Sequence, residues 1–135
     1  MLRSRQTALH LVFVYGTLKK GYYNNYFLEN QTFIKEAISE PKYLLYDNGS
    51  YPCLLIADKD GFAVKGEIWE VDDPCLHRLD MLEGTAGPRP LYKRGTVDIQ
   101  DDSIKSAIGY FYQRNVDRFT PVLPKNEEKY IIWEG

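Results

Sequence analysis

The chain has few of the side chains that bind metals or carry redox chemistry. Its 135 residues include only two cysteines, Cys53 and Cys75, and two histidines, His10 and His77. The cysteines lie far apart and form no Cys-x-x-Cys pair, so the spacing typical of a zinc site is missing. We therefore expect no metal site, and we expect both cysteines to be inert, buried side chains of the core.

Long apolar runs and basic stretches are also missing. The apolar segment after Arg3 and Arg5 is too short to cross a bilayer and lacks the small-residue pattern of a signal cleavage site. The 17 basic and 19 acidic residues are mixed along the chain and give a net charge of −2, so no basic stripe is available for nucleic acid. These absences argue against membrane and nucleic-acid partners and predict a cytoplasmic protein.

Aromatic residues, by contrast, are abundant, and the eleven tyrosines and six phenylalanines favour strands. Short apolar or alternating stretches separated by Gly, Pro, Asn and Asp predict about seven strands. These are residues 9–15, 32–39, 42–46, 53–57, 64–71, 92–99 and 104–112, the last two as a hairpin. We expect one α+β domain over residues 1–135, a small, mostly antiparallel β-barrel or strongly curled sheet with flanking short helices. Residues 1–8 would be an N-terminal extension, and residues 115–135 a tail that packs on the barrel through its aromatic end.

Two helical segments are expected. Asn24 can cap a short helical turn that packs residues 26–28 inward. The Asp73-Pro74 pair predicts the start of a longer helix, because the aspartate can cap free N–H groups and proline suits the first turn. Gly84 predicts its end, so this helix would cover residues 74–83.

The loop over residues 16–21 is the first candidate for a binding site. The apolar strand stops there at a glycine, and such a bend can expose backbone N–H groups that hold a carboxylate. Thr17 adds a hydroxyl that can donate or accept. The same residues also suit an ordinary strand-ending turn, and both interpretations remain open. A Walker ending and Gly-x-Gly-x-x-Gly spacing are absent, which argues against a nucleotide site.

Glu83 is the second candidate, because helical geometry directs it toward apolar surroundings. It follows Leu76 by seven residues and Leu79 by four, so the three share one helix face. Burial and the negative end of the helix dipole would both raise its pKa, as a general acid or base needs near neutral pH. The alternative is a solvated glutamate at the edge of the apolar stripe. Asp80, rotated off that stripe, is expected to be a surface charge.

Other catalytic arrangements have less support in the sequence. No Gly-x-Ser-x-Gly motif is present, and Cys75 and His77 are two residues apart on one helix and so do not face each other. In the last predicted strand, Tyr110 or Tyr112 could direct a hydroxyl into the barrel mouth, although core packing is the commoner role.

Three segments and a Tyr-Lys-Arg triplet follow one another in a specific order. They are Val12-Phe-Val-Tyr-Gly-Thr-Leu-Lys-Lys-Gly21, Val64-Lys-Gly-Glu-Ile-Trp-Glu-Val71, Leu79-Asp-Met-Leu-Glu-Gly84 and Tyr92-Lys-Arg94. Together they resemble the γ-glutamylcyclotransferase-like family, with the γ-glutamylaminecyclotransferases as the nearest look-alikes. The similarity runs from about Leu11 to Tyr112, and only the tail lies outside it.

This resemblance implies a small barrel and a reaction without metal or organic cofactor. It implies that the loop of Tyr15, Gly16, Thr17 and Leu18 holds a γ-glutamyl group and that Glu83 accepts a proton. The expected partner is a small-molecule γ-glutamyl substrate, cyclised to 5-oxoproline with release of an amine. A γ-glutamylamine, such as the ε-lysine isopeptide, is the preferred substrate. Two alternatives remain, γ-glutamyl amino acids or glutathione-like peptides as substrates, and a barrel that only binds its ligand; the oligomeric state is left open.

Overall fold

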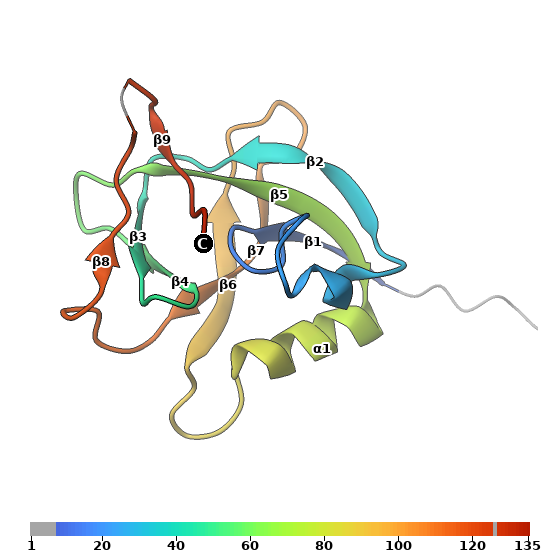
Figure 1. Ribbon diagram of the computed structural model, residues 1–135. Coiled ribbons are helices and arrows are strands. Elements are labelled where there is room, and N and C mark those ends of the chain that lie inside the picture. Colours follow the sequence, from blue (N-terminus) through green and yellow to red (C-terminus); the bar gives the residue numbers. More distant parts are fainter. Residues whose placement is uncertain (1–7, 126) are drawn as a thin grey trace, which may run out of the picture.

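The computed structural model describes residues 8–125 and 127–135, and strands dominate it (Figure 1). Most of the predicted N-terminal extension, residues 1–7, lies outside the described residues. The strands are β1 Leu9–Val14, β2 Thr32–Ile38, β3 Tyr43–Asp47, β4 Pro52–Ile56, β5 Ala63–Asp72, β6 Tyr92–Asp98, β7 Ser106–Tyr112, β8 Thr120–Pro121 and β9 Tyr130–Ile131. The helices are a 3₁₀ turn, η1 Asn25–Leu28, and one α-helix, α1 Asp73–Glu83.

The described strands form two sheets and no closed barrel, which is one of the two forms, barrel or strongly curled sheet, that the sequence predicts. The larger sheet has the order β2-β5-β1-β7-β6, with β9 paired to β5, and the smaller one has the order β4-β3-β8. Pairing is antiparallel except between β1 and β7 and between β5 and β9. The outer strands of the larger sheet approach each other only through an isolated bridge between Ser39 and Ile99. The pairing does not continue beyond that bridge, so the predicted closure into a barrel is not confirmed. The α+β class and the mostly antiparallel pairing are confirmed.

Strand β1 is central, as its continuous apolar sequence predicts. It lies between β5 and β7, and its side chains alternate between two apolar clusters. Phe13 belongs to one cluster, and Val12 and Val14 belong to the other. Helix α1 contributes to the second cluster through Leu76 and Leu79, so it covers the face of the sheet on which Val12 and Val14 lie.

The short helical turn forms at the predicted place but buries fewer side chains than expected. Leu28 is 1% exposed, whereas Tyr26 is 65% exposed and so points to solvent. A single 3₁₀ turn has three residues per turn and cannot direct three successive side chains inward. The Asn24 side chain makes no cap hydrogen bond, because its amide instead donates to the hydroxyl of Thr17.

Helix α1 begins one residue earlier than predicted and is capped by Asp72 rather than by Asp73. Asp72 is still in the extended conformation of β5, and its carboxylate accepts a hydrogen bond from the Cys75 N–H at 2.9 Å. Gly84 ends the helix in the left-handed conformation with φ 66°, as expected. Within the described part of the chain, no helix is long and apolar enough to cross a membrane.

The C-terminal tail adds short strands to both sheets. Strand β8 pairs with β3, and β9 pairs with β5. Ile131 and Trp133 are 0% and 3% exposed, so the aromatic end of the tail is part of the core. The Lys19 Nζ donates to the Trp133 carbonyl at 2.7 Å, which ties the tail to the loop that follows β1.

Candidate active site

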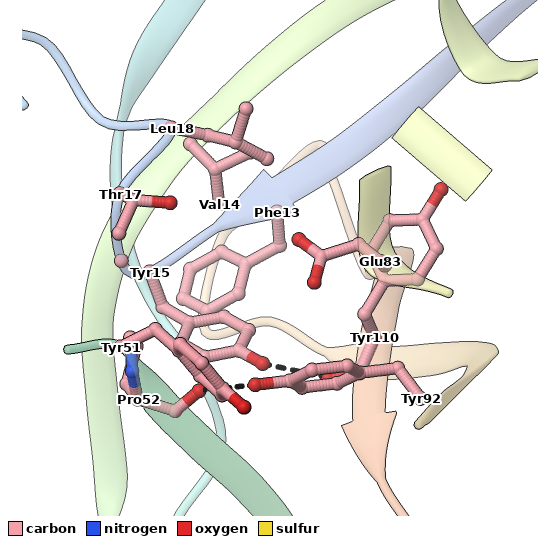
Figure 2. Close-up of a pocket in the computed structure, with 11 residues that line it drawn as sticks. Phe13, Val14, Tyr15, Thr17, Leu18, Tyr51, Pro52, Glu83, Tyr92 and Tyr110 are labelled. Atoms are coloured by element: carbon pink, nitrogen blue, oxygen red, sulfur yellow. Dashed lines mark hydrogen bonds between the residues drawn. The ribbon is translucent and has the colours of Figure 1, made fainter. Parts of the chain in front are cut away.

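A pocket with an empty volume of about 370 Å³ lies where β1 ends (Figure 2). Its walls are mainly apolar and aromatic, with a few polar groups, as is typical of a small-molecule site. Glu83, Tyr110 and residues 15–18 are part of this lining, whereas the other sequence candidates, Tyr112 and residues 19–21 of the loop, are not. The lining residues are Phe13, Val14, Tyr15, Gly16, Thr17, Leu18, Tyr51, Pro52, Glu83, Tyr92 and Tyr110.

Helix α1 carries Glu83 onto the pocket wall. Leu76 and Leu79, on the same helix face, are 4% and 0% exposed, so this face is anchored in the core as the spacing predicts. The carboxylate points toward the ring of Phe13 (Figure 2). Burial raises the pKa of Glu83 to about 7, the direction predicted from the sequence. Near neutral pH this carboxyl can therefore both accept and donate a proton.

The loop after β1 presents backbone donors at the pocket. The N–H groups of Gly16, Thr17 and Leu18 have no hydrogen-bond partner among the described residues. The next two N–H groups are already bound, that of Lys19 to the Gly16 carbonyl at 3.1 Å and that of Lys20 to the Glu67 carboxylate at 3.1 Å. Thr17 and Leu18 are 9% and 5% exposed, and buried N–H groups without a partner are rare in folded proteins. These three groups are therefore available to an oxygen-bearing ligand.

The shape of this loop is held by contacts to Asn24 and Pro52. The Asn24 side-chain amide donates to the Thr17 hydroxyl at 2.9 Å, and the Asn24 N–H donates to the Thr17 carbonyl at 2.9 Å. A Cβ on Gly16 would lie 2.5 Å from the Pro52 ring, so glycine is needed for this close approach. Besides its predicted role in the bend, this glycine therefore allows the loop to pack against β4.

Tyr110 lines the pocket, and the proton of its hydroxyl is already used in a hydrogen bond within the protein. It donates to the Asp80 carboxylate at 2.6 Å, and Arg94 Nε donates to the same carboxylate at 3.2 Å. The expectation that Asp80 is only a surface charge is therefore wrong, since it joins α1 to β6 and β7. Partial burial acts to raise the pKa of Asp80, but hydrogen bonds from Arg94 and Tyr110 outweigh it and hold that pKa below its usual value.

The sequence does not single out Tyr51, Pro52 or Tyr92 as lining residues. The Tyr92 hydroxyl donates to the Pro52 carbonyl at 2.8 Å, and the Tyr15 hydroxyl donates to the Tyr110 carbonyl at 2.7 Å (Figure 2). Both hydroxyls are thus anchored to backbone, and the rings form the pocket wall. Tyr92 begins the Tyr-Lys-Arg triplet, which is the one sequence signal that could have pointed to it.

The cysteines behave as buried thiols. Cys53 and Cys75 are both 0% exposed and free, and burial raises the pKa of Cys53 to about 11. The predicted burial of both cysteines in the core is confirmed, and a thiol with a raised pKa carries little thiolate, as expected of an inert cysteine. In residues 8–125 and 127–135, no three His, Cys, Asp or Glu side chains converge as metal ligands.

Comparison with known proteins assigns the chain to a family. Residues 12–132 match the model described as γ-glutamyl cyclotransferase, AIG2-like. The chain belongs to this family. The family resemblance seen in the sequence is thus confirmed, and the match extends past Tyr112 into the tail, which the sequence analysis places outside the resemblance.

The relatives of this γ-glutamyl cyclotransferase family member carry names that refer to different γ-glutamyl compounds. The γ-L-glutamyl-butirosin B γ-glutamyl cyclotransferase of Niallia circulans is 32% identical over 111 residues, which cover 80% of this chain and 69% of that protein. γ-Glutamylaminecyclotransferase A of Danio rerio is 36% identical over 96 residues, 66% of this chain and 58% of that protein. A solved mouse AIG2-like structure is 28% identical with a TM-score of 0.65, covering 78% of this chain and 77% of that one.

Proposed function

We propose that the chain cyclises γ-glutamylamines to 5-oxoproline, with Glu83 as general base and then general acid. One observation carries the proposal: the Glu83 carboxyl, with its pKa raised to about 7, lines the same pocket as the unpaired N–H groups of residues 16–18. The Danio rerio relative, named as a γ-glutamylaminecyclotransferase, supports an amine as the leaving group. The proposal needs no group other than those of the chain and its substrate.

The reaction requires a proton acceptor at the substrate nitrogen. The α-ammonium of the γ-glutamyl group must lose a proton before its nitrogen attacks the γ-carbonyl carbon, and ionised Glu83 accepts that proton. A bond then forms between the α-nitrogen and the γ-carbon, and the bond from the γ-carbon to the departing amine breaks. Protonated Glu83 gives its proton to the departing nitrogen, and the second proton that the ring nitrogen must lose passes to the released amine, directly or through solvent. The products are 5-oxoproline and the amine in its ammonium form.

The loop supplies the orientation. The N–H groups of residues 16–18 hold the α-carboxylate, as exposed backbone donors at a bend can do. Nucleophile and electrophile belong to one molecule, so a pocket that keeps the chain curled provides most of the proximity effect. No nucleophile from the protein is needed, which agrees with the buried thiols of both cysteines.

A substrate panel tests the proposal. The purified chain would be incubated with ε-(γ-glutamyl)lysine, with γ-glutamyl amino acids and with glutathione, and 5-oxoproline would be quantified by mass spectrometry. We expect the γ-glutamylamine to be cyclised fastest. Faster cyclisation of the amino acid or peptide substrates would favour the other enzymatic alternative. Recovery of every compound intact after binding would leave a protein that binds γ-glutamyl compounds without catalysis.

Activity should depend on pH through Glu83. The carboxyl must be ionised to accept a proton, and its pKa is raised to about 7. We therefore expect kcat/KM to rise as pH increases through about 7, because this parameter reports the ionisation of the free enzyme. The measurement is the initial rate of 5-oxoproline formation at low substrate concentration in a series of buffers. A profile that falls with rising pH in this range would contradict the assignment of Glu83 as base.

A further inference from the structure

Glu67 is a buried residue that lies beside the binding loop but outside the pocket. It belongs to β5, where it is paired with Val14, the last residue of β1. Glu67 is 8% exposed and is not among the residues that line the pocket. A buried carboxyl is costly unless hydrogen bonds satisfy it, so the partners of this one indicate what it does.

The carboxyl of Glu67 accepts hydrogen bonds from two N–H groups. Its Oε1 accepts one from the Lys20 backbone at 3.1 Å and one from the Trp69 Nε1–H at 3.0 Å. Residues 67 and 69 lie on the same face of β5, because side chains alternate along a strand. The indole is held by the core, since Trp69 is 7% exposed and packs edge-on against Phe33 with ring centroids 5.5 Å apart. The carboxyl is therefore fixed in the direction of Lys20.

One residue thus holds the binding loop near both of its ends. The backbone of Glu67 pairs with Val14, just before the loop begins, and its side chain binds the Lys20 N–H, where the loop ends. Between these two points lie residues 16–18 with their free N–H groups. The direction of these N–H groups therefore depends on a side chain that does not reach the pocket.

We propose that Glu67 is a positioning residue for the α-carboxylate of the substrate. It holds the loop in the shape in which the N–H groups of residues 16–18 converge on the pocket. Through them it determines how strongly the site favours substrates that carry an α-carboxylate. The inference rests on the proposed function and adds to it a residue that acts on the substrate only through the loop.

Loss of this acceptor would release the backbone of the loop. The Lys20 N–H would turn to water, and residues 16–18 would no longer be held between two fixed points. The Lys19 ammonium would still donate to the Trp133 carbonyl, but that contact runs through a long, flexible side chain and does not fix the backbone N–H groups. A displacement of about 1 Å in a binding site can cost about 100-fold in rate.

Two variants separate the hydrogen bond from the charge. Glu67→Gln keeps an oxygen at the same reach, and one oxygen is enough because Oε1 accepts from both donors. Glu67→Met has a similar length but offers only a weak thioether acceptor. We therefore expect the loop to stay in place in the glutamine variant and to be released in the methionine variant.

A matched pair of compounds measures what the loop contributes. ε-(γ-Glutamyl)lysine carries an α-carboxylate, and ε-(4-aminobutyryl)lysine is the same compound without it. In Glu67→Met we expect KM of the first compound to rise about tenfold or more, the usual effect of losing hydrogen bonds to a charged group. Its kcat should be nearly unchanged, because the α-carboxylate is bound equally in the ground state and the transition state. The inhibition constant of the second compound should change by less than about threefold, since it makes no such hydrogen bonds.

The conservative variant and the second compound exclude a general effect on the fold. Glu67→Gln should restore KM to within about threefold of the wild-type value, because the acceptor is kept. Equal KM values in the glutamine and methionine variants would overturn the inference alone. An equal loss of affinity for both compounds in Glu67→Met would also overturn it, because damage to the whole pocket does not distinguish them.

Glu67→Asp replaces Glu67→Met if the methionine variant does not fold. It keeps the charge, but its carboxyl falls short of the Lys20 N–H by about the length of a carbon–carbon bond. The same rise in KM is expected, and an unchanged KM would contradict the inference. If the wild-type protein yields no 5-oxoproline from any γ-glutamyl compound, the proposed function fails and the inference fails with it.

Discussion

Glu83→Gln should lower the rate of 5-oxoproline release by about 100- to 10,000-fold, the usual contribution of a positioned acid–base group. The amide has nearly the size of the carboxyl, so the pocket at the end of β1 and the N–H groups of residues 16–18 should be preserved. Because an amide cannot take the proton from the α-ammonium, substrate should still bind but should remain uncyclised. The measurement is initial rate by mass spectrometry together with substrate affinity by calorimetry.

Glu29→Gln provides the matched control. Glu29 is exposed, follows η1 and is not among the residues that line the pocket. This variant should cyclise substrate at the wild-type rate. Cyclisation by Glu83→Gln at the wild-type rate would contradict the assignment of Glu83 as the proton acceptor.

Glu83→Gln should also change how stability depends on pH. The carboxyl has an ordinary pKa of 4.5, and burial raises it to about 7 in the folded protein. Between these two values the carboxyl has lost its proton in the unfolded chain but keeps it in the folded protein. The free energy of unfolding of the wild-type protein therefore falls as pH rises from 4.5, and this effect levels off above about 7. The glutamine variant lacks this loss. Its Tm relative to wild type should therefore increase from pH 4.5 to about 7, and a constant difference would contradict burial of the carboxyl.

Gly66→Ala should reduce the free energy of unfolding by about 1–3 kcal/mol, the usual cost of inserting an atom into a packed core. A Cβ at this position in β5 would lie 2.5 Å from the carbonyl oxygen of Val14 and 2.7 Å from Cζ of Phe13. Both residues belong to β1, so the strand would have to move away from β5. Because Phe13 and Val14 also line the pocket that holds Glu83, cyclisation should slow as well. Chemical denaturation measures the first effect, and the substrate assay measures the second.

Glu70→Ala on the same strand is the control for this substitution. Glu70 is partly exposed, so its replacement should change the free energy of unfolding by no more than about 0.5 kcal/mol. Wild-type stability in Gly66→Ala would show that β1 and β5 are not packed as closely as their contacts indicate.

Much of the architecture follows from local signals in the sequence. The apolar run of β1 predicts a central strand, and the Asp101-Asp102-Ser103 turn predicts the hairpin of β6 and β7, which pair antiparallel. The Leu76, Leu79 and Glu83 spacing predicts which helix face enters the core. Side-chain direction repeats with a fixed period along a strand or a helix, so these features need no knowledge of distant residues.

Features set by contacts between distant residues were predicted less well. Asp80 is an acceptor because Arg94 and Tyr110 come from two other strands, and no spacing along the chain encodes that meeting. The cap of α1 shifted to Asp72 because β5 extends to that residue. Tyr51 and Pro52 enter the pocket because β4 lies against the loop after β1, where Gly16 leaves space for the proline ring.

By itself the sequence determined the α+β class, the family and the apolar face on which a single acid is placed, because each of these depends on residue order and on the period of one element. Only the tertiary structure decided that the strands form two sheets, and that the outer strands of the larger one meet at the bridge between Ser39 and Ile99. It alone brought the Glu83 carboxyl, with its raised pKa, and the free N–H groups of residues 16–18 into one pocket. Burial and the closure of a pocket depend on every element that packs around a residue, and this information is not contained in any one segment of the chain.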